Sequence, residues 1–227
     1  MIAAHNIGPM PAPKKPTSAR KRPRRGPGRP VGSSSDATKR KLLEAAHREF
    51  ADLGYAAATT PSIVKRAGVS PSVLYHHFGS KPALYCAVIE WQVDISLEAF
   101  EEAIAGRRTL LERIDAILEA QTVIWPQYGH DNPILVMAPF EVRRHPELKA
   151  AREQLRRNEA FYTRLVAESE DVKKPDDGLA QMCLAIVWGL SGVGAIVPDV
   201  AMYLRAVEAM RRLVAHEAVS PPERKRR

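Results

Sequence analysis

The apolar positions of this chain recur every three to four residues from about residue 36 to residue 218, which is the spacing of amphipathic α-helices. The first such segment, 36–53, collects five apolar residues on one stripe: Leu42, Leu43, Ala46, Phe50 and Leu53. We find no convincing strand pattern and no internal repeat. The pattern therefore predicts an all-α protein of about nine helices.

The first three expected helices lie close together along the chain. Each follows a serine or threonine that can cap its first turn, and each ends at a glycine that can adopt the left-handed conformation. In chain order the caps, helices and glycines are Ser35, 36–53 and Gly54; Thr60, 61–67 and Gly68; Ser70, 71–78 and Gly79.

The later helices are expected to be longer and to form a separate bundle. Ser80 can cap the fourth, whose apolar stripe runs from Leu84 to Ala99. The remaining five are expected at 110–124 (ending near Trp125-Pro126), 133–144 (kinked or split by Pro139), 146–169, 177–194 and from 198 to about 218.

Residues 178–198 contain no charged side chain, and 21 residues are long enough to span a bilayer. Gln181, Ser191, four glycines and a terminal proline argue instead for a helix buried in a core or a subunit interface. The N-terminus lacks the apolar stretch of a secretory signal. We therefore expect a cytoplasmic protein that has no membrane span.

Positive charge is concentrated at the N-terminal end of the chain, whose total net charge is +8. Residues 1–35 hold eight basic and no acidic side chains, and their Pro, Gly and Ser content predicts a disordered arm. Within it, Gly28-Arg29-Pro30 is similar to an AT-hook, which would place Arg29 in a minor groove. A polyanion bound by the arm would explain the charge, and a solvated tail is the alternative. Residues 219–227 form a second basic tail.

The sequence from 59 to 84 has the order of a helix-turn-helix, a motif that lays its second helix in the major groove of DNA. In 71–78, Leu74, His77 and Phe78 share a face that we expect to pack on the first helix. The opposite face, expected to meet DNA, carries Ser72, Tyr75 and His76.

Several side chains of this motif are candidate DNA contacts. Ser72 can bond a base edge or a phosphate, and Val73 can touch a thymine methyl. Phosphate contacts are expected from Thr60, Lys65, Tyr75, His76 and Lys81. Ser70 and His77 complete the set of candidates, with a helix cap and a packed core histidine as their respective alternatives. His76 and His77 point about 100° apart, so we expect no metal there, and no cofactor.

From about Ala37 to Val88 the chain resembles the tetracycline-repressor (TetR) family. The matching pieces are Phe50-Ala51-Asp52-Leu53-Gly54-Tyr55, Thr59-Thr60, Ile63, Ala67-Gly68-Val69-Ser70, Leu74-Tyr75-His76-His77-Phe78, Ser80-Lys81 and Leu84. Val64 replaces the usual alanine. Pro71-Ser72-Val73 departs from the family's recognition helix, which leaves the base preference open.

The resemblance implies a homodimer formed through the last two helices and a bundle that binds a small ligand, whose binding releases a DNA operator. The expected division is an arm at 1–35, a DNA-binding domain at 36–82, a ligand-binding and dimerisation domain at 83–218 and a tail at 219–227. An apolar or amphipathic ligand would contact residues that are otherwise plain core: Trp125, Met137, Phe140, Met182 and Trp188. Glu141 or Gln121 would offer it a polar anchor.

Other classes of protein have less support. We find no nucleophile elbow, metalloprotease, P-loop or dinucleotide motif, so an enzyme is not expected. An architectural or activating DNA-binding protein without an inducer remains the alternative to a repressor. Cys86 and Cys183 each lie in an apolar helical run, where a buried thiol is the default reading and a redox sensor the other.

Overall fold

The computed structural model describes residues 33–128, 134–196 and 199–219; at 33–34, 124–128, 194–196 and 215–219 the description covers the backbone alone. All regular elements in these ranges are helical, which confirms the expected all-α class. They are α1 (Ser33–Ala57), α2 (Thr60–Ala67), α3 (Pro71–Phe78), α4 (Lys81–Ile104), α5 (Leu110–Tyr128), α6 (Ile134–Arg144), the 3₁₀ turn η1 (Pro146–Leu148), α7 (Ala151–Ala167), α8 (Asp177–Ile196) and α9 (Val200–Val219). Arg29 and the tail from 220 lie outside the described residues.

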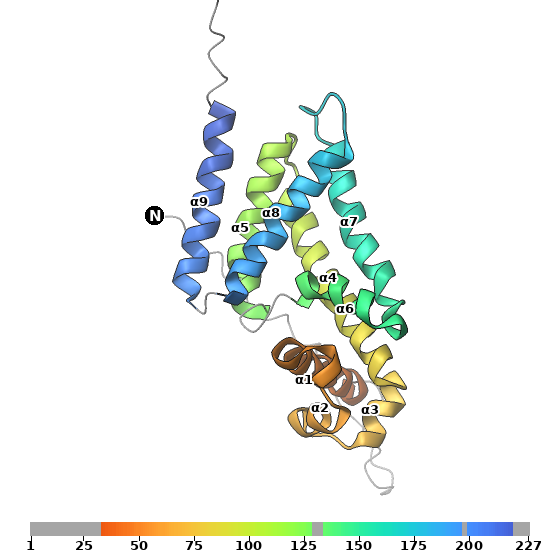
Figure 1. The fold of residues 1–227 in the computed structure, drawn as a ribbon. Helices are drawn as coiled ribbons and strands as arrows, with labels where there is room; N and C mark the ends of the chain where they lie inside the picture. The colour runs from red at the N-terminus through yellow and green to blue at the C-terminus, as the bar shows by residue number, and fades with distance from the viewer. Residues whose placement is uncertain (1–32, 129–133, 197–198, 220–227) are drawn as a thin grey trace, which may run out of the picture.

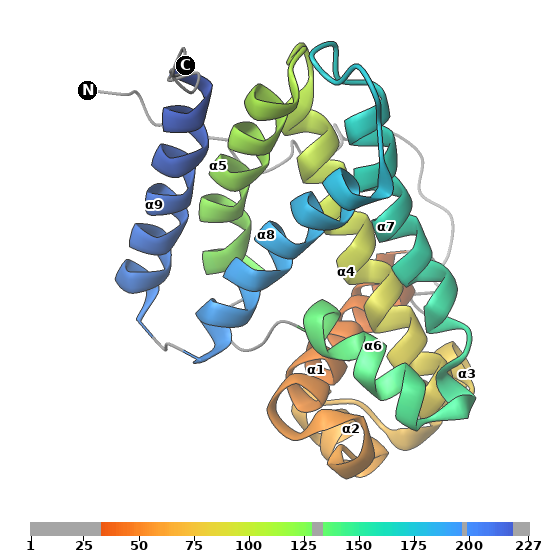
Figure 2. The same cartoon turned by 45° about the horizontal axis from the view of Figure 1, so that its top comes forward.

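Helices α1, α2 and α3 form a head at one end of the molecule (Figure 1). The long helix α4 leaves the head and enters a bundle with α5, α7, α8 and α9. Helix α6 lies between head and bundle, close to α1 and α4 (Figure 2). The head and the bundle are thus joined in two ways: α4 belongs to both, and α6 packs against helices of both.

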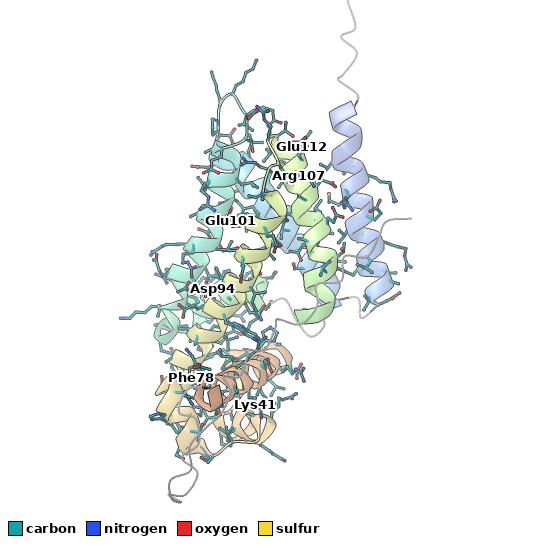
Figure 3. All side chains as sticks on the ribbon, turned by 180° about the vertical axis from the view of Figure 1, so that it is seen from behind. Lys41, Phe78, Asp94, Glu101, Arg107 and Glu112 are labelled. Carbon is teal, nitrogen blue, oxygen red and sulfur yellow. The ribbon has the colours of Figure 1, made fainter. Side chains whose placement is uncertain are left out.

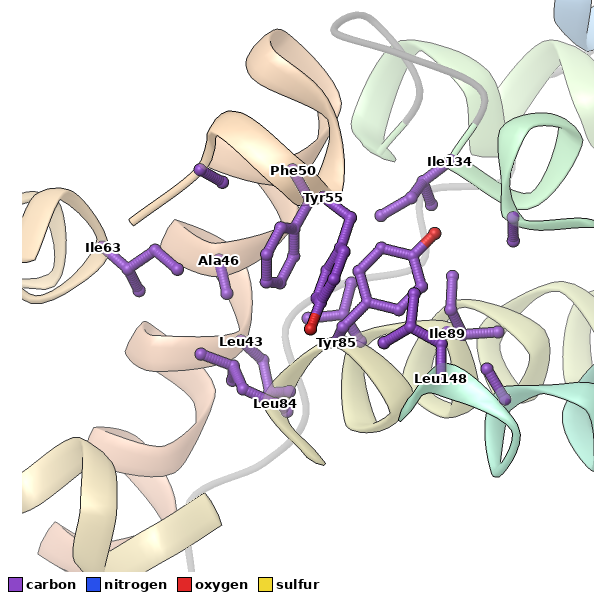
Figure 4. Packing of buried hydrophobic residues seen from close by; sticks show 14 of the residues in the cluster. Leu43, Ala46, Phe50, Tyr55, Ile63, Leu84, Tyr85, Ile89, Ile134 and Leu148 are labelled. Atoms are coloured by element: carbon purple, nitrogen blue, oxygen red, sulfur yellow. The ribbon is translucent and has the colours of Figure 1, made fainter. Parts of the chain in front are cut away.

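The core of the head also contains residues from the rest of the chain. Leu42 and Phe50 of α1, Ile63 of α2 and Leu74 of α3 are all buried in it. The same cluster includes buried side chains from later elements: Leu84, Tyr85, Ile89, Ile134, Ala138, Val142 and Leu148 (Figure 4). The head therefore packs on α4 and α6 as one continuous apolar unit.

A second core fills the bundle. Its buried members come from four helices and the end of α4, and they include Phe100, Ile114, Ile117, Phe161, Leu165, Cys183, Val187, Tyr203 and Val207. Helix α9 packs mainly against α5, with fewer contacts to α8. No helix in the described ranges, α8 included, is both long and apolar enough to cross a membrane.

Helices α4 and α7 run side by side and parallel. Arg157 binds Asp94 at 2.9 Å, and Arg164 pairs with Glu101; both pairs span 63 residues of sequence. Because Asp94 and Glu101 are seven residues apart on α4, and Arg157 and Arg164 are seven residues apart in the same order on α7, the two helices run in the same direction. Asp94 and Glu101 are seen one above the other along α4 in Figure 3.

The start of α2 corrects one predicted cap. Thr59, not Thr60, occupies the cap position: its Oγ1 accepts a hydrogen bond from Ser62 N at 3.2 Å, and Ser62 Oγ accepts one from Thr59 N at 3.4 Å. A proline is tolerated anywhere in the first helical turn, so Pro61 does not fix which residue precedes the helix. The shift frees the Thr60 hydroxyl for other contacts.

Four further boundaries differ from prediction. Ser35, expected as a cap, lies inside α1, which begins by Ser33. The first helical run of α1 does end at Gly54 as predicted, although its φ of 76° and ψ of 168° are not those of a left-handed helix, and a second short run continues beyond this kink to Ala57. Helix α5 continues through Pro126 because a proline in a last turn forfeits only one backbone bond. Pro139 does not split α6. The expected helix 146–169 is divided into η1 and α7.

Candidate nucleic-acid interface and bundle interior

The turn between α2 and α3 is set by Gly68. Its φ of 67° and ψ of 35° place it in the left-handed region, which favours glycine. Gly68 N donates to Lys65 O at 3.3 Å and Val69 N donates to Val64 O at 3.1 Å, so the end of α2 is satisfied before the chain turns. The predicted role of Gly68 as the end of the helix is confirmed.

Helix α3 has one buried face and one exposed face, as its sequence predicts. Leu74 is fully buried, whereas Ser72, Tyr75 and His76 are exposed. His77 is half-buried beside Phe78. Val73 is half-buried and packs against the core of the head, which limits how far its methyl groups can reach outward.

Ser70 holds the cap position of α3, but its side chain makes no capping hydrogen bond. Its hydroxyl instead lies 2.8 Å from Ser72 Oγ. The carbonyl of Ser70 already accepts from Val73 N at 3.1 Å, so that N–H does not need the hydroxyl. The cap interpretation of the Ser70 side chain was wrong, and its hydroxyl lies at the exposed start of α3.

The candidate contacts of α2 and α3 lie next to one another. Thr60 Oγ1 and Tyr75 Oη are 3.4 Å apart, which links the start of α2 to the exposed face of α3. Lys65 is exposed on α2. Hydroxyl and ammonium groups are among the side chains that commonly contact DNA phosphates.

Lys81, at the start of α4, is held by the head. Its Nζ donates to Ala56 O at 3.2 Å and lies 4.5 Å from the centre of the Tyr55 ring. Burial lowers the pKa of Lys81, although the carboxylates of Glu147 and Glu141 oppose that shift. Ser80 caps α4 as predicted, with Ala83 N donating to its Oγ at 3.2 Å.

A contact between Tyr55 and His145, which connects α6 to η1, joins the head to the rest of the chain. The ring of Tyr55 meets His145 edge-on with centroids 4.9 Å apart, and His145 Nε2 lies 3.4 Å from Glu141 Oε2. Burial raises the pKa of Tyr55 to about 12, helped by Glu147. Glu141, predicted as a ligand contact, is thus placed at this junction.

The predicted ligand residues that the structure describes lie in different surroundings. Met137 and Glu141 line a small cavity beside the head. Phe140 and Met182 are exposed, Trp188 is half-buried against the bundle core, and buried Gln121 accepts a hydrogen bond from Tyr203 Oη at 3.3 Å. The side chain of Trp125 lies outside the described residues.

Three polar side chains inside the bundle were missed by the sequence reading. Gln92 Nε2 on α4, and Asn158 Nδ2 and Tyr162 Oη on α7, are buried without a hydrogen-bond partner among the described residues. Burial strongly raises the pKa of Tyr162, so its hydroxyl stays protonated. The sequence signal that could have indicated them is an amide side chain on an otherwise apolar helical stripe, such as Gln92 between Ile89 and Val93.

Both cysteines lie where burial disfavours the thiolate. Cys183 is fully buried and burial raises its pKa to about 11, while half-buried Cys86 has its pKa raised by the same cause. The thiolate is the reactive form, so these positions fit unreactive core thiols.

A short α2, a left-handed glycine and an α3 with an exposed polar face are the features of a helix-turn-helix, a motif that lays its second helix in the major groove of DNA. Residues 42–88 match the family model described as bacterial regulatory proteins, tetR family. These residues therefore form a helix-turn-helix domain of the tetR family.

Individual relatives agree with this family. The HTH-type transcriptional activator FasR of Mycolicibacterium smegmatis is 39% identical over 104 residues, covering 43% of this chain and 48% of the relative. The chain spans about half the length of the curated relatives it matches. The family and these relatives are transcriptional regulators, not enzymes.

Solved structures share the fold. The fatty acid degradation regulator FadR from Bacillus halodurans superposes with a TM-score of 0.63 at 16% identity, covering 77% of this chain and 96% of that one. FadR from Bacillus subtilis, solved in complex with stearoyl-CoA, gives 0.60 at 19% identity, with coverage of 75% and 96%. At these identities the likeness concerns the fold alone.

Proposed function

We propose that this protein binds a palindromic DNA operator as a homodimer and acts as a repressor that a small apolar or amphipathic ligand releases. The observation that carries DNA binding is the exposed face of α3, where Ser72, Tyr75 and His76 stand beside Thr60. We assign DNA contact to 36–82 and ligand binding and dimerisation to 83–218. A protein with this role would be located in the cytoplasm, associated with the nucleoid.

Dimerisation through α8 and α9 is supported by their exposed apolar residues. Met182 and Val193 on α8 are eleven residues apart, as are Met202 and Leu213 on α9, and all four are exposed. Eleven residues are about three helical turns, so each pair lies on one side of its helix. A partner subunit covering these sides would remove them from water.

Ligand binding in the bundle is supported by the unpartnered polar atoms of Gln92, Asn158 and Tyr162. Buried polar groups are nearly always hydrogen-bonded, so three such atoms on two packed helices call for a partner. A ligand with a polar group and an apolar body would satisfy them while filling space between the helices. The predicted contacts Gln121, Trp125, Phe140 and Trp188 remain candidates around it.

DNA binding is tested by footprinting across the genome and by fluorescence anisotropy with the operator found. A discrete protected palindrome whose half-sites lie about 34–36 Å apart, or a multiple of that, supports the proposal. Uniform coating of any DNA would contradict it and favour an architectural protein. Arg29→Ala should weaken binding mainly at A/T-flanked operators, because the arm is proposed to enter the minor groove.

Ligand binding is tested by native mass spectrometry of protein purified from cells, followed by extraction of any bound molecule. The proposal is supported if a small molecule co-purifies with the protein and releases it from the operator. That molecule should be lost in Asn158→Leu and retained in Glu159→Gln, which lies on the exposed side of α7. Stearoyl-CoA is a reasonable first added probe, because one structural neighbour was solved with it. Release that is unaffected by Asn158→Leu would contradict this site.

Activation is the second candidate for the direction of regulation. The relative of highest identity given above is named a transcriptional activator. Deleting the gene and measuring transcripts next to each footprint separates the two: loss of a repressor raises them and loss of an activator lowers them.

A further inference from the structure

A small cavity of 120 Å³ lies at the junction of the head and the bundle, apart from the unpartnered groups of the bundle interior. Three helices supply its walls: α1, α4 and α6. The lining side chains that matter below are Phe50, Tyr55, Tyr85, Ile134 and Glu141, with the backbone of Gly54 at one side. At about 30 Å³ for an atom the size of water, the cavity has room for about four non-hydrogen atoms.

The hydroxyl of Tyr85 has no hydrogen-bond partner among the described residues, although the residue is only 1% exposed. Figure 4 shows this hydroxyl pointing away from α4 towards Ile134, which also lines the cavity. A hydroxyl that is buried without a partner loses its hydrogen bonds to water and gains none in return. The position therefore calls for an occupant that can hydrogen-bond to it.

The charge and the walls of the cavity select the kind of occupant. Glu141 is the only ionisable acid or base among its lining residues besides the tyrosines, and its side chain is 14% exposed. The rings of Phe50 and Tyr55 both meet that of Tyr85 edge-on, with Phe50–Tyr85 and Tyr55–Tyr85 centroids 5.0 and 5.2 Å apart. A carboxylate next to aromatic rings favours a cation, through charge and through the negative ring faces. Lys81 Nζ lies 4.5 Å from the centre of the Tyr55 ring, but Lys81 does not line the cavity, so no basic side chain stands among the described lining residues.

His145 does not remove this preference. Its Nε2 is 3.4 Å from Glu141 Oε2, whereas Oε1 of the same carboxylate lies on the side of Gly54, where a Cβ would come within 3.3 Å. Oε1 therefore keeps acceptor capacity, and a side chain at position 54 would intrude on it.

We propose that this junction cavity binds a small organic cation of the methylated-amine class. The N–H of the cation donates to Glu141 or to Tyr85 Oη, and its methyl groups contact the aromatic walls. Because α1 and α6 both line the cavity, an occupant contacts the head and the remainder of the chain at once. This binding does not depend on the ligand proposed for the bundle interior.

The test uses trimethylammonium chloride and full-length protein, with binding followed by ligand-observed NMR and thermal unfolding at constant ionic strength. 2-Propanol, which has the same number of non-hydrogen atoms and no charge, is the matched probe. We expect saturable binding of trimethylammonium and none of 2-propanol. No saturable binding, or equal binding of both probes, would overturn the proposal.

Variants locate the site. Glu141→Gln should weaken binding about tenfold or more, because it removes a charged hydrogen-bond acceptor. Glu147→Gln, an exposed carboxylate of η1 that does not line the cavity, should leave binding unchanged, and so should Asn158→Leu in the bundle. Wild-type affinity in a folded Glu141→Gln protein would contradict the site, whatever the fate of the bundle ligand.

Tyr85→Phe keeps the test decisive if Glu141→Gln fails to fold. It deletes only a hydroxyl that has no partner, so the fold should persist. Binding of trimethylammonium should weaken severalfold. Unchanged affinity in this variant together with loss in Asn158→Leu would place the cation in the bundle and overturn the proposal.

Discussion

Arg211 of α9 binds both carboxylate oxygens of Asp115 on α5, from Nε to Oδ1 at 2.7 Å and from Nη2 to Oδ2 at 3.0 Å. This two-point pairing, in a side chain that is 26% exposed, raises the pKa of Arg211, and Glu119 and Glu208 lie nearby. It holds α9 on α5 while the exposed apolar sides of α8 and α9 remain available.

Arg211→Leu should lower the free energy of unfolding by about 1 kcal/mol, because a partly exposed ion pair with two hydrogen bonds is lost. Urea unfolding at one fixed protein concentration measures this. Arg212→Leu is the matched control, since Arg212 is 69% exposed and its ion pair with Glu208 is long at 3.9 Å. Equal effects of the two substitutions would show that the Asp115 pairing has no special weight.

Lys65 and Lys81 should behave differently when changed to alanine. Lys65 is exposed on α2, so Lys65→Ala should weaken DNA binding about equally at all sequences and reduce the slope of log K against log salt by about 1. Tyr75→Ala should also weaken binding at all sequences. Anisotropy titrations over a range of salt concentrations measure both.

Lys81→Ala should in addition lower the free energy of unfolding by about 1 kcal/mol, because Lys81 binds Ala56 O and lies over Tyr55. Chemical unfolding tests this, with Lys65→Ala as the control. A stable Lys81→Ala protein with a flatter salt dependence would show that Lys81 serves DNA rather than the head.

Gly54→Ala should destabilise the protein by more than 1 kcal/mol. The φ of Gly54 is +76°, and an added Cβ would lie 3.3 Å from Glu141 Oε1. Gly68→Ala has open space around its Cβ, and Gly68 lies in the αL region (φ 67°, ψ 35°), which other residues adopt at a lower cost than the φ 76°, ψ 168° of Gly54. Thermal unfolding should give the larger loss for Gly54→Ala; the reverse order would contradict a close approach of α6.

Glu49 should make stability depend on pH in the acid range. Ser62 and Arg66, whose Nε is 2.7 Å from Glu49 Oε1, lower the pKa of Glu49 below 4.5 in the folded protein. A lowered folded pKa contributes stability that is complete above the unfolded pKa and is lost as pH falls through the folded value. Wild type should therefore exceed Glu49→Gln in stability at neutral pH, by about 1 kcal/mol.

That difference should shrink as the pH falls below 4.5. Urea unfolding of both proteins across this range measures it. Glu44→Gln, at an exposed position on the same helix, should change stability by less than about 0.5 kcal/mol at either pH. A constant difference between wild type and Glu49→Gln would rule out the linkage.

Local sequence signals predicted the all-helical class and the helix-turn-helix because they act over a few residues. Gly68 and Ser80 end and begin helices as their types suggest, and Leu74 separates the two faces of α3. Thr59 was missed because two adjacent threonines can both cap, and the choice depends on Ser62. Ser70 was misread because the partner of a hydroxyl, here Ser72, is not specified by its position.

The ligand-binding side could not be predicted to the same extent. Whether Met137 lines a cavity, Met182 lies in water or Gln121 meets Tyr203 depends on how helices far apart in sequence pack together. Residues that were missed, such as Asn158, carry no local mark beyond a polar type on an apolar stripe. Their burial follows only from tertiary packing.

The shared core has a consequence for recombining this protein with its relatives. Ile134, Ala138 and Val142 of α6 are buried in the same cluster as Phe50 and Leu74 of the head. A chimera that exchanges only residues 36–82 would place a foreign surface against α6 and create gaps or clashes. Grafting a new operator specificity onto this chain is therefore best done by changing the outward-facing side chains of α3 and leaving its inward face, and α6, as they are.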